Sequence, residues 1–347
     1  MMNCDSLIFV TYDGVENSVF ESQVIVPLQN YQNAHPENSI SIISFEKNPE
    51  RFAQKKYPFE VIFLKKYPYC GKLSLLPAFF QLRGQLKKFN NYSIIARGPV
   101  AGFLAVQAAR KISCKNLKIQ ARGLLAQEYM YTKQNTGTLA HIMHRFRAHL
   151  YATLEKKMYQ LAAQNAFPIT IEAVSPALKN YIADEYQVDK KCITIAHDDI
   201  PLSIRPAKKI MWRNQIRSEL GIPAQSKVYC YNGSAKPWQC PSETIAYFKE
   251  QLSKDALSFL LLLSDEPDIF QSLCRKYELM QNSYRILHVA HANIYQYLAA
   301  ADVGIVFRQP HIINWISRPT KVLEYQALGL EIAHNNTVAM LTKVTLQ

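Results

Sequence analysis

Short apolar runs rich in β-branched residues alternate with helical patterns along almost the whole chain, and this alternation limits the possible folds most strongly. In the first part of the chain we expect strands at residues 7–12, 39–45, 60–64, 93–96, 118–121, 169–174 and 192–196. Helical patterns lie between several of them, at residues 20–31, 73–89, 100–112 and 139–164. Strand–helix alternation is typical of a doubly wound α/β sheet.

A break in this pattern follows residue 196. Residues 197–209 (HDDIPLSIRPAKK) carry acidic, proline and basic residues without periodicity, which predicts a linker. The alternation then restarts, with strands expected at 228–231, 258–263, 284–289 and 303–307 and helices at 243–252, 268–280 and 294–300. We therefore predict two Rossmann-like domains, 1–200 and 201–347, which face each other across a cleft and bind ligands beyond the carboxyl ends of their strands.

Composition narrows the class of protein further. A hydrophobic content of 48% with 19% charged residues is that of a globular protein, and the net charge of +13 indicates an acidic partner. That partner could be a phosphate-bearing substrate, an anionic membrane or a nucleic acid, and charge alone does not choose. The seven cysteines are scattered without a C-x-x-C motif, which favours free thiols in a reducing compartment over a disulfide framework or a zinc site.

The sequence predicts a cytoplasmic protein. No signal peptide pattern opens the chain, and the longest apolar run, residues 259–263, is too short to span a bilayer. The helical pattern at 139–164 mixes Arg, Lys and His with large apolar residues. Such a helix can lie on an anionic leaflet at the inner face of the cell membrane, and the alternative is an ordinary amphipathic helix packed on the sheet.

Residues 301–332 form the clearest strand–loop–helix pattern. Pro319 stands where a first helical position is expected, so the N–H groups of Thr320 and Lys321 would face an anion at the helix end. Glu324 lies about one turn after Lys321 on the same face, where a carboxylate can accept hydrogen bonds from the hydroxyls of a ribose. The segment therefore predicts a diphosphate and ribose site. The alternative is a capped helix with a solvated Lys–Glu pair.

Several motifs resemble those of a known family. YNGSAKPWQ at 231–239, AADVGIVFR at 300–308 and SRPTKVLEYQALGLEI at 317–332 resemble the donor-binding domain of the group 1, family-4-like glycosyltransferases, which have the two-domain GT-B fold. TYDG, SQV at 22–24, IIARG, ARGLLAQE and AVSPALKNYI at 173–182 resemble the acceptor domain of the same family. The resemblance covers nearly the whole chain, and its donor-domain motifs are the more specific ones.

The resemblance implies a set of donor-binding residues. They are Gly233, Ser234, Lys236, Arg308, Ser317, Thr320, Lys321 and Glu324. In the family the glycine turn lets backbone N–H groups approach the donor diphosphate, although an ordinary tight turn would also explain a glycine here. A rim salt bridge would likewise explain Arg308. Lysines that stabilise the departing nucleoside diphosphate suit this chemistry, and without a D-x-D motif we expect neither a metal nor any cofactor besides the nucleotide-sugar donor.

The acceptor side is expected in the first domain. The resemblance implies acceptor contacts at Gly14, Gln23 and Arg122, and catalytic roles for Glu128 and Lys321. Glu128 could orient an acceptor hydroxyl, and its alternative is a surface helix residue. The predicted reaction is transfer of a sugar, with retention, from a nucleotide-diphosphate sugar to a saccharide or lipid-linked saccharide in surface polysaccharide biosynthesis.

Two departures from the family pattern leave other functions open. Ile316 stands where the family has a second glutamate, and only a strand at 331–336 and a short tail follow Gly329, so we expect an incomplete C-terminal domain. A catalytically impaired relative that binds nucleotide or glycan without turnover is therefore the alternative. A sugar-nucleotide epimerase is a weaker one. No nucleic-acid-binding motif accompanies the basic charge, so we expect no nucleic-acid partner.

Overall fold

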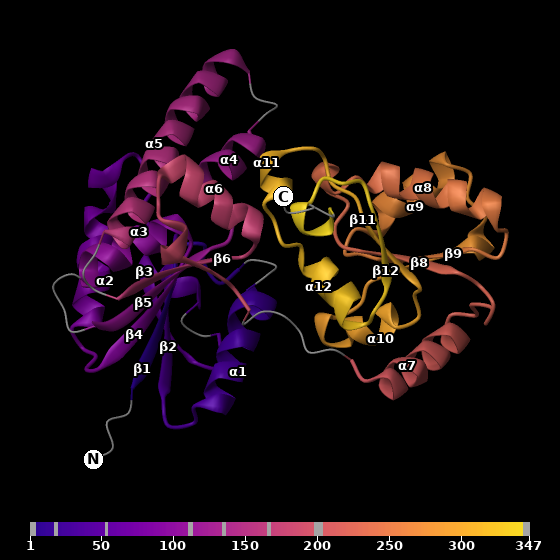
Figure 1. The fold of residues 1–347 in the computed structure, drawn as a ribbon, viewed down its shortest axis with the longest axis horizontal. Coiled ribbons are helices and arrows are strands. Elements are labelled where there is room, and N and C mark those ends of the chain that lie inside the picture. Colours follow the sequence, from indigo (N-terminus) through magenta and orange to yellow (C-terminus); the bar gives the residue numbers. More distant parts are fainter. Residues whose placement is uncertain are drawn as a thin grey trace. The chain divides into compact units, whose positions relative to one another are not determined.

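A computed structural model describes residues 5–342, with the exception of 17–19, 53–54, 110–113, 134–136, 165–167 and 198–203. The chain divides into two compact units, Met1–Asp199 and Ile200–Gln347 (Figure 1). Each unit is built on one sheet, of seven and of five described strands respectively, and every described pair of strands is parallel. The predicted α/β class with two Rossmann-like units is therefore confirmed.

The first unit has the strand order β3-β2-β1-β4-β5-β6-β7. Its strands are β1 Ser6–Thr11, β2 Ser39–Glu46, β3 Glu60–Lys65, β4 Tyr92–Arg97, β5 Cys114–Ala121, β6 Ile169–Ala173 and β7 Ile193–Ile195. Its helices are α1 Val26–Ala34, α2 Leu76–Leu86, α3 Gly98–Ala109, α4 Leu125–Tyr131, α5 Thr138–Ala163 and α6 Pro176–Tyr186. Because β1 pairs with both β2 and β4, the chain reverses its direction of travel across the sheet between β1 and β4. The loops that follow these two strands therefore diverge and leave room for a ligand.

The second unit repeats this plan in the order β10-β9-β8-β11-β12. Its strands are β8 Val228–Asn232, β9 Phe259–Leu263, β10 Tyr284–Leu287, β11 Val303–Val306 and β12 Glu331–His334. Its helices are α7 Pro206–Glu219, α8 Pro241–Lys254, α9 Pro267–Lys276, α10 Ile294–Leu298, α11 Ile312–Trp315 and α12 Thr320–Ala327. The corresponding reversal lies between β8 and β11.

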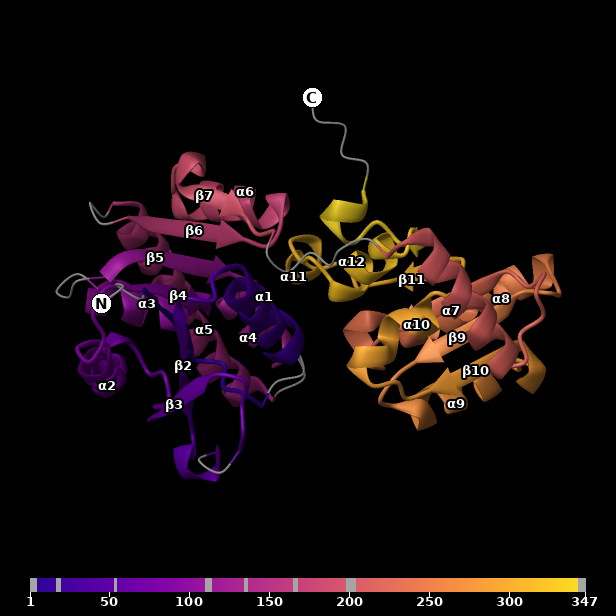
Figure 2. The ribbon, with the colours of Figure 1, turned by 90° about the horizontal axis from the view of Figure 1, so that it is seen from below.

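Alternate residues of β8 explain why helices cover both faces of the second sheet (Figure 2). Val228 and Cys230 belong to one apolar cluster with residues of α7, α10 and α12. Tyr229 and Tyr231 belong to the other cluster, with residues of α8 and α9. A strand buried on both faces reads as a continuous apolar run, and this is why the alternation of apolar runs and helices was visible in the sequence.

The predicted linker is wrong at its C-terminal end. Its last residues already form helix, because α7 begins at Pro206, and a proline is well suited to a first helical position. The earlier part of the linker, residues 198–203, lies outside the described residues. Helix α9 is shorter than predicted: it ends at Lys276, and Glu278 then adopts a left-handed conformation with φ +55°.

Helix α7 is anchored by a buried charge network. Arg217 is only 5% exposed and donates to the carbonyl of Ala300 and, at 2.8 Å, to the carboxylate of Asp302. The same carboxylate accepts from Arg213 at 2.6 Å and from the amide of Val228 at 2.8 Å. Burial lowers the pKa of Arg217, and Asp302 opposes that shift. Because buried charges need partners, this network fixes α7 against the start of β11.

Gly304 of β11 provides a test of packing in the second unit. A Cβ at this position would lie 2.2 Å from the ring of Tyr325, whose side chain is fully buried. The Tyr325 hydroxyl accepts from the amide of Asn232 at 3.0 Å, so the ring cannot easily move. Gly304→Ala is therefore expected to destabilise this unit by about 2 kcal/mol.

Urea unfolding followed by tryptophan fluorescence measures this change, because Trp212, Trp238 and Trp315 are the three tryptophans of the sequence and all belong to the second unit. Gln326→Ala, on the exposed side of α12, is the control and should stay within about 0.5 kcal/mol of the wild type. An unchanged midpoint for Gly304→Ala would contradict the close packing of β11 against α12.

Candidate functional site

The second unit brings Lys321 into contact with the glycine turn that follows β8. Lys321 is only 7% exposed. Its Nζ donates to Gln239 Oε1 at 2.9 Å and lies 4.0 Å from the centre of the Tyr231 ring. Helix α12 carries this lysine in its first turn; the helix begins at Thr320, with Pro319 as its N-cap, one residue later than predicted.

Gly233 is required by this close approach. Its φ of +147° suits glycine, and a Cβ would lie 2.8 Å from Lys321 Nζ and 3.0 Å from Gln239 Oε1. Any other residue would therefore displace the lysine. The Gly233 amide donates to the carbonyl of Leu263 at 2.9 Å, and the next-but-one amide, that of Ala235, donates to Glu266. The glycine thus brings backbone close to Lys321 and does not contribute its own amide.

Glu324 lies on the same helix and is 4% exposed. Its Oε2 accepts from Asn232 Nδ2 at 2.7 Å, across 92 positions of sequence. The alternative of a solvated Lys–Glu pair is therefore wrong, since both side chains are buried. Burial holds the pKa of Lys321 well below its ordinary value; the positive charge of Arg308 adds to this shift and the charge of Glu324 opposes it.

The other predicted donor residues differ in their contacts, and only one of the three described next joins this centre. Ser234 Oγ accepts from Gln239 Nε2 at 3.0 Å and so joins the Lys321 contacts. Lys236 Nζ instead lies 5.3 Å from the centre of the Trp238 ring, and Ser317 Oγ donates to the carbonyl of Asn314 at 2.7 Å.

The sequence motifs include Gln239 without marking it as a binding residue, and they show Ile316 as a departure from the family. Gln239 links Lys321 to Ser234, and its place in the YNGSAKPWQ motif was the only signal for it. Ile316, which stands where the family has a glutamate, is 2% exposed at the end of α11. An apolar side chain buried there provides no carboxylate for a sugar hydroxyl.

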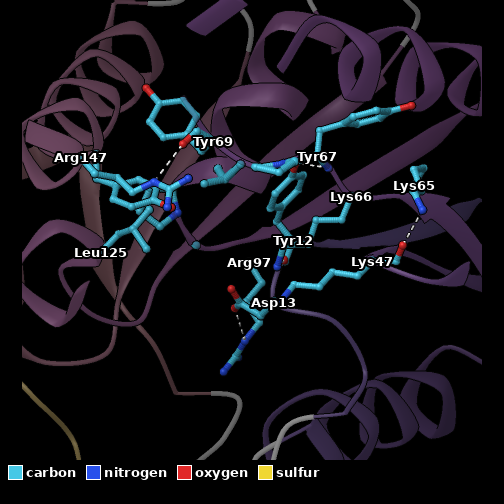
Figure 3. A pocket seen from close by; sticks show the side chains of 15 residues that line it. Tyr12, Asp13, Lys47, Lys65, Lys66, Tyr67, Tyr69, Arg97, Leu125 and Arg147 are labelled. Carbon is cyan, nitrogen blue, oxygen red and sulfur yellow. Dashed lines mark hydrogen bonds and ion pairs between the residues drawn. The ribbon is translucent and has the colours of Figure 1, made fainter. Parts of the chain in front are cut away.

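A pocket of about 560 Å³ opens in the first unit (Figure 3). It lies where β1, β2, β3 and β4 end and where α3 and α5 approach. The residues that line it are Tyr12, Asp13, Lys47, Lys65, Lys66, Tyr67, Pro68, Tyr69, Arg97, Gly98, Pro99, Val100, Leu125, Arg147 and Tyr151. Basic and tyrosine side chains dominate this lining.

None of the three predicted acceptor residues lines this pocket, although Gln23 contacts a lining residue and Gly14 follows one in sequence. Gln23 lies in a π-helical turn, Glu21–Ile25, and its Oε1 accepts from Arg97 Nη2 at 2.6 Å. Gly14 has φ +81°, and a Cβ there would lie 2.8 Å from Glu46 Oε2, so only glycine fits. The third predicted residue, Arg122, is not among the residues that line the pocket.

Two carboxylates with raised pKa values lie on and beside α4. Glu128 is an exposed residue of this helix, as the alternative for it stated, yet desolvation and next the charge of Asp13 raise its pKa to about 7. Glu155 of α5 is fully buried and accepts from the amides of Leu125 and Ala126 at 2.8 and 3.1 Å. Burial raises its pKa to about 7, and these amides oppose the shift. Glu155 was missed in the sequence, where a carboxylate among apolar helix positions was the available signal.

Neither metal nor membrane features stand out in the described part of the chain. Among these residues no group of three or more His, Cys, Asp or Glu side chains is placed to hold a metal ion. None of the described helices combines the length and the apolar character needed to cross a bilayer.

Comparison with solved structures identifies the fold. A glycosyltransferase from Rickettsia africae ESF-5 has a TM-score of 0.62 at 13% identity, over 97% of this chain and 80% of that one. WaaG, a glycosyltransferase involved in lipopolysaccharide biosynthesis, has a TM-score of 0.59 at 14% identity, over 97% and 82%. A UDP-N-acetylglucosamine 2-epimerase has a TM-score of 0.53 at 11% identity, over 98% and 85%.

By its fold, the chain is a structural relative of the GT-B glycosyltransferases, as its motifs predicted. The likeness to an epimerase shows that this fold is not restricted to sugar transfer. No family model matches the sequence, and no curated protein matches it in sequence.

Glu155 makes the stability of the first unit depend on pH. Its folded pKa of about 7 lies above its ordinary value of 4.5, so the folded state binds the proton more tightly. Its stabilising contribution is complete below pH 4.5 and is lost as pH rises through about 7. Relative to Glu155→Gln, the wild type should lose about 2 to 3 kcal/mol between pH 5 and pH 8.

Urea unfolding followed by circular dichroism at both pH values measures this difference. Glu185→Gln, at an exposed position of α6, is the control and should follow the wild type. Parallel stability curves for Glu155→Gln and the wild type would show that Glu155 is ionised throughout.

Proposed function

We propose that this chain is a glycosyltransferase that moves a sugar, with retention, from a nucleotide-diphosphate sugar to a saccharide or lipid-linked saccharide acceptor in surface polysaccharide biosynthesis. The observation that carries the proposal is the contact of buried Lys321 with the Gly233 turn. Burial lowers the pKa of this lysine, and a diphosphate beside it would oppose that shift and favour its charged form. The WaaG likeness supports the choice of pathway.

The donor would be held by the groups around this lysine. Lys321 and Arg308 supply positive charge for the diphosphate of the leaving group, which is the charge that develops as the sugar departs. Glu324 is oriented by Asn232 through Oε2, and its carboxylate is proposed to accept from the ribose hydroxyls. Ser234, Lys236, Ser317 and Thr320 complete the proposed donor set, with the Ser234 amide as the backbone donor of the turn.

The acceptor would bind in the first unit, beside Gly14, Gln23 and Arg122. Glu128 is proposed to orient the attacking hydroxyl. Its pKa of about 7 lets it exchange a proton near neutral pH, as a group that assists a hydroxyl must. The proposed domain roles are therefore acceptor binding in 1–200 and donor binding in 201–347.

Nucleotide binding tests the donor site. Calorimetric titration with UDP, GDP and ADP should show selective binding of one nucleotide, and Lys321→Ala and Glu324→Ala should each weaken it about tenfold or more, because each removes a charge-assisted contact. Gln326→Ala, on the exposed side of the same helix, is the matched control and should bind as the wild type does. Folding of every variant is checked by thermal unfolding. Absence of binding to all three nucleotides by the folded chain would refute the donor site.

A catalytically impaired relative is the second candidate, and buried Ile316 is the observation that favours it. Such a protein would bind the nucleotide through Lys321 and Glu324 without releasing it from a donor sugar. Release of nucleoside diphosphate from UDP-, GDP- and ADP-sugars, with and without added saccharide, separates the two. An epimerase would interconvert the donor sugar without any acceptor.

We further propose that α5 contacts an anionic membrane at the cytoplasmic face. One end of α5 projects beyond its unit (Figure 1). Four large side chains at its N-terminal end are exposed, at spacings that place them on one side of the helix: Leu139, Ile142, Met143 and Phe146. Arg145 and His149 of the same helical half are also exposed. Apolar and basic groups together suit the interface of an anionic leaflet.

Vesicle flotation tests this contact. The wild type should float with vesicles containing anionic lipid, and Met143→Ser/Phe146→Ser should reduce the bound fraction severalfold, because about 1 to 3 kcal/mol of burial is lost for each side chain. Ile210→Ser/Met211→Ser removes two exposed apolar groups of α7, somewhat less exposed than those of α5, and is the control. Equal flotation of both double variants would contradict a specific role for α5.

A further inference from the structure

The pocket of the first unit has an unusual combination of side chains. Five cationic residues line it, namely Lys47, Lys65, Lys66, Arg97 and Arg147, against the single carboxylate of Asp13. That carboxylate lies 3.7 Å from Arg97 Nε and also acts on the charge of Lys66, as does Glu46 at the end of β2, outside the lining. Positive charge therefore exceeds negative charge among the lining residues, on several sides of the pocket (Figure 3).

These cations are held in place by the backbone of the pocket rim. Lys66 Nζ donates to the carbonyl of Tyr12 and lies 5.0 Å from the centre of its ring. Lys65 Nζ donates to the carbonyl of Lys47 at 2.7 Å, and Arg147 Nε donates to the carbonyl of Tyr69 at 3.3 Å. Carbonyl oxygens orient the charges without neutralising them.

A helix adds to the positive potential. The first residues of α3, from Gly98 to Val100, line the same pocket, so the N-terminal end of a helix of 12 residues faces it. Amides at such an end carry partial positive charge and favour an anion. Burial lowers the pKa of Lys66, and the charges of Asp13 and Glu46 oppose that shift, as an anion bound beside the lysine would.

Tyrosines provide much of the remaining surface of the pocket. Tyr12, Tyr67, Tyr69 and Tyr151 line the pocket, and the rings of Tyr69 and Tyr151 stack with centroids 5.0 Å apart. Tyr12 donates to the carbonyl of Tyr67 at 2.8 Å and accepts from its amide at 3.2 Å, so the loop after β3 is tied to the end of β1. Ordered aromatic faces with hydroxyl groups suit a sugar ring, which has apolar C–H faces and many hydroxyls.

We infer that this pocket binds a saccharide that carries a phosphate or a carboxylate, so that the acceptor of the transfer is an anionic saccharide. That this saccharide is the acceptor of a transfer rests on the proposed function. The pocket and the chemistry of its ligand do not depend on the donor site. Lys66 and Arg147 are the residues that would bind the anionic group from opposite sides, and the tyrosines would hold the ring.

Calorimetric titration of the full chain with four probes tests the inference. The probes are glucose, glucose 6-phosphate, glucuronate and inorganic phosphate. At least one of the two anionic sugars should bind about tenfold or more tightly than glucose, and Lys66→Gln should abolish that advantage, since it removes one charge-assisted contact. Preference for glucose 6-phosphate identifies a phosphate group, and preference for glucuronate identifies a carboxylate.

Controls separate the pocket from general electrostatics and from the donor site. Lys87 is an exposed lysine at the end of α2, outside the pocket, and is more exposed than Lys66. Lys87→Gln should leave all four affinities unchanged. Arg147→Gln should weaken the same anionic sugar as Lys66→Gln does, and thermal unfolding verifies that both variants fold. UDP binding, measured in parallel, should not change in either variant.

Equal affinity for glucose and both anionic sugars would overturn the inference. Inorganic phosphate that binds as tightly as glucose 6-phosphate would also overturn it, because the pocket would then be a simple anion site. If nucleotide binding fails while the anionic sugar binds through Lys66, the anionic saccharide pocket stands and the proposed transfer reaction fails. The opposite pair of results would refute the pocket and leave the donor site intact.

Discussion

Parallel pairing of strands is the constraint on which the rest of this structure depends. Because every described pair is parallel, the strands of each unit end at a common edge, and each connection must cross the sheet through a helix or long loop. The chain reverses between β1 and β4 in one unit and between β8 and β11 in the other. Loops diverge at these two points, and the candidate donor and acceptor sites lie there.

Both units also contain buried ionisable side chains. Lys321 and Glu324 are buried in one, and Glu155 is buried in the other. Burial lowers the pKa of Lys321 and raises that of Glu155, so in both cases it disfavours the charged form. Each residue therefore contributes less to stability than an apolar residue of similar size could. Such a cost is expected where a chain maintains polar groups for binding rather than for folding.

Basic residues of the chain lie together at both candidate sites. Part of the excess positive charge lines the pocket of the first unit, and part surrounds the glycine turn of the second, as Arg308 and Lys321. Positive charge at both places is what the proposed diphosphate donor and the proposed anionic acceptor would require. The fold by itself does not choose these ligands, since structures of a transferase and an epimerase both resemble it.

Apolar periodicity is local, and for this reason the sequence by itself determined the order of the strands, the two-unit α/β class and the pair Lys321 and Glu324 on one helical turn. It did not predict the helices α4, α6, α7 and α11. It did not predict Glu155 beneath α4 or the link from Gln239 to Lys321, which spans 82 positions. Contacts over such separations depend on which strands pair and how deeply helices pack, so only the tertiary structure decided them. It also decided that Lys321 and Glu324 are buried, because spacing on a helix specifies a face but not what covers it.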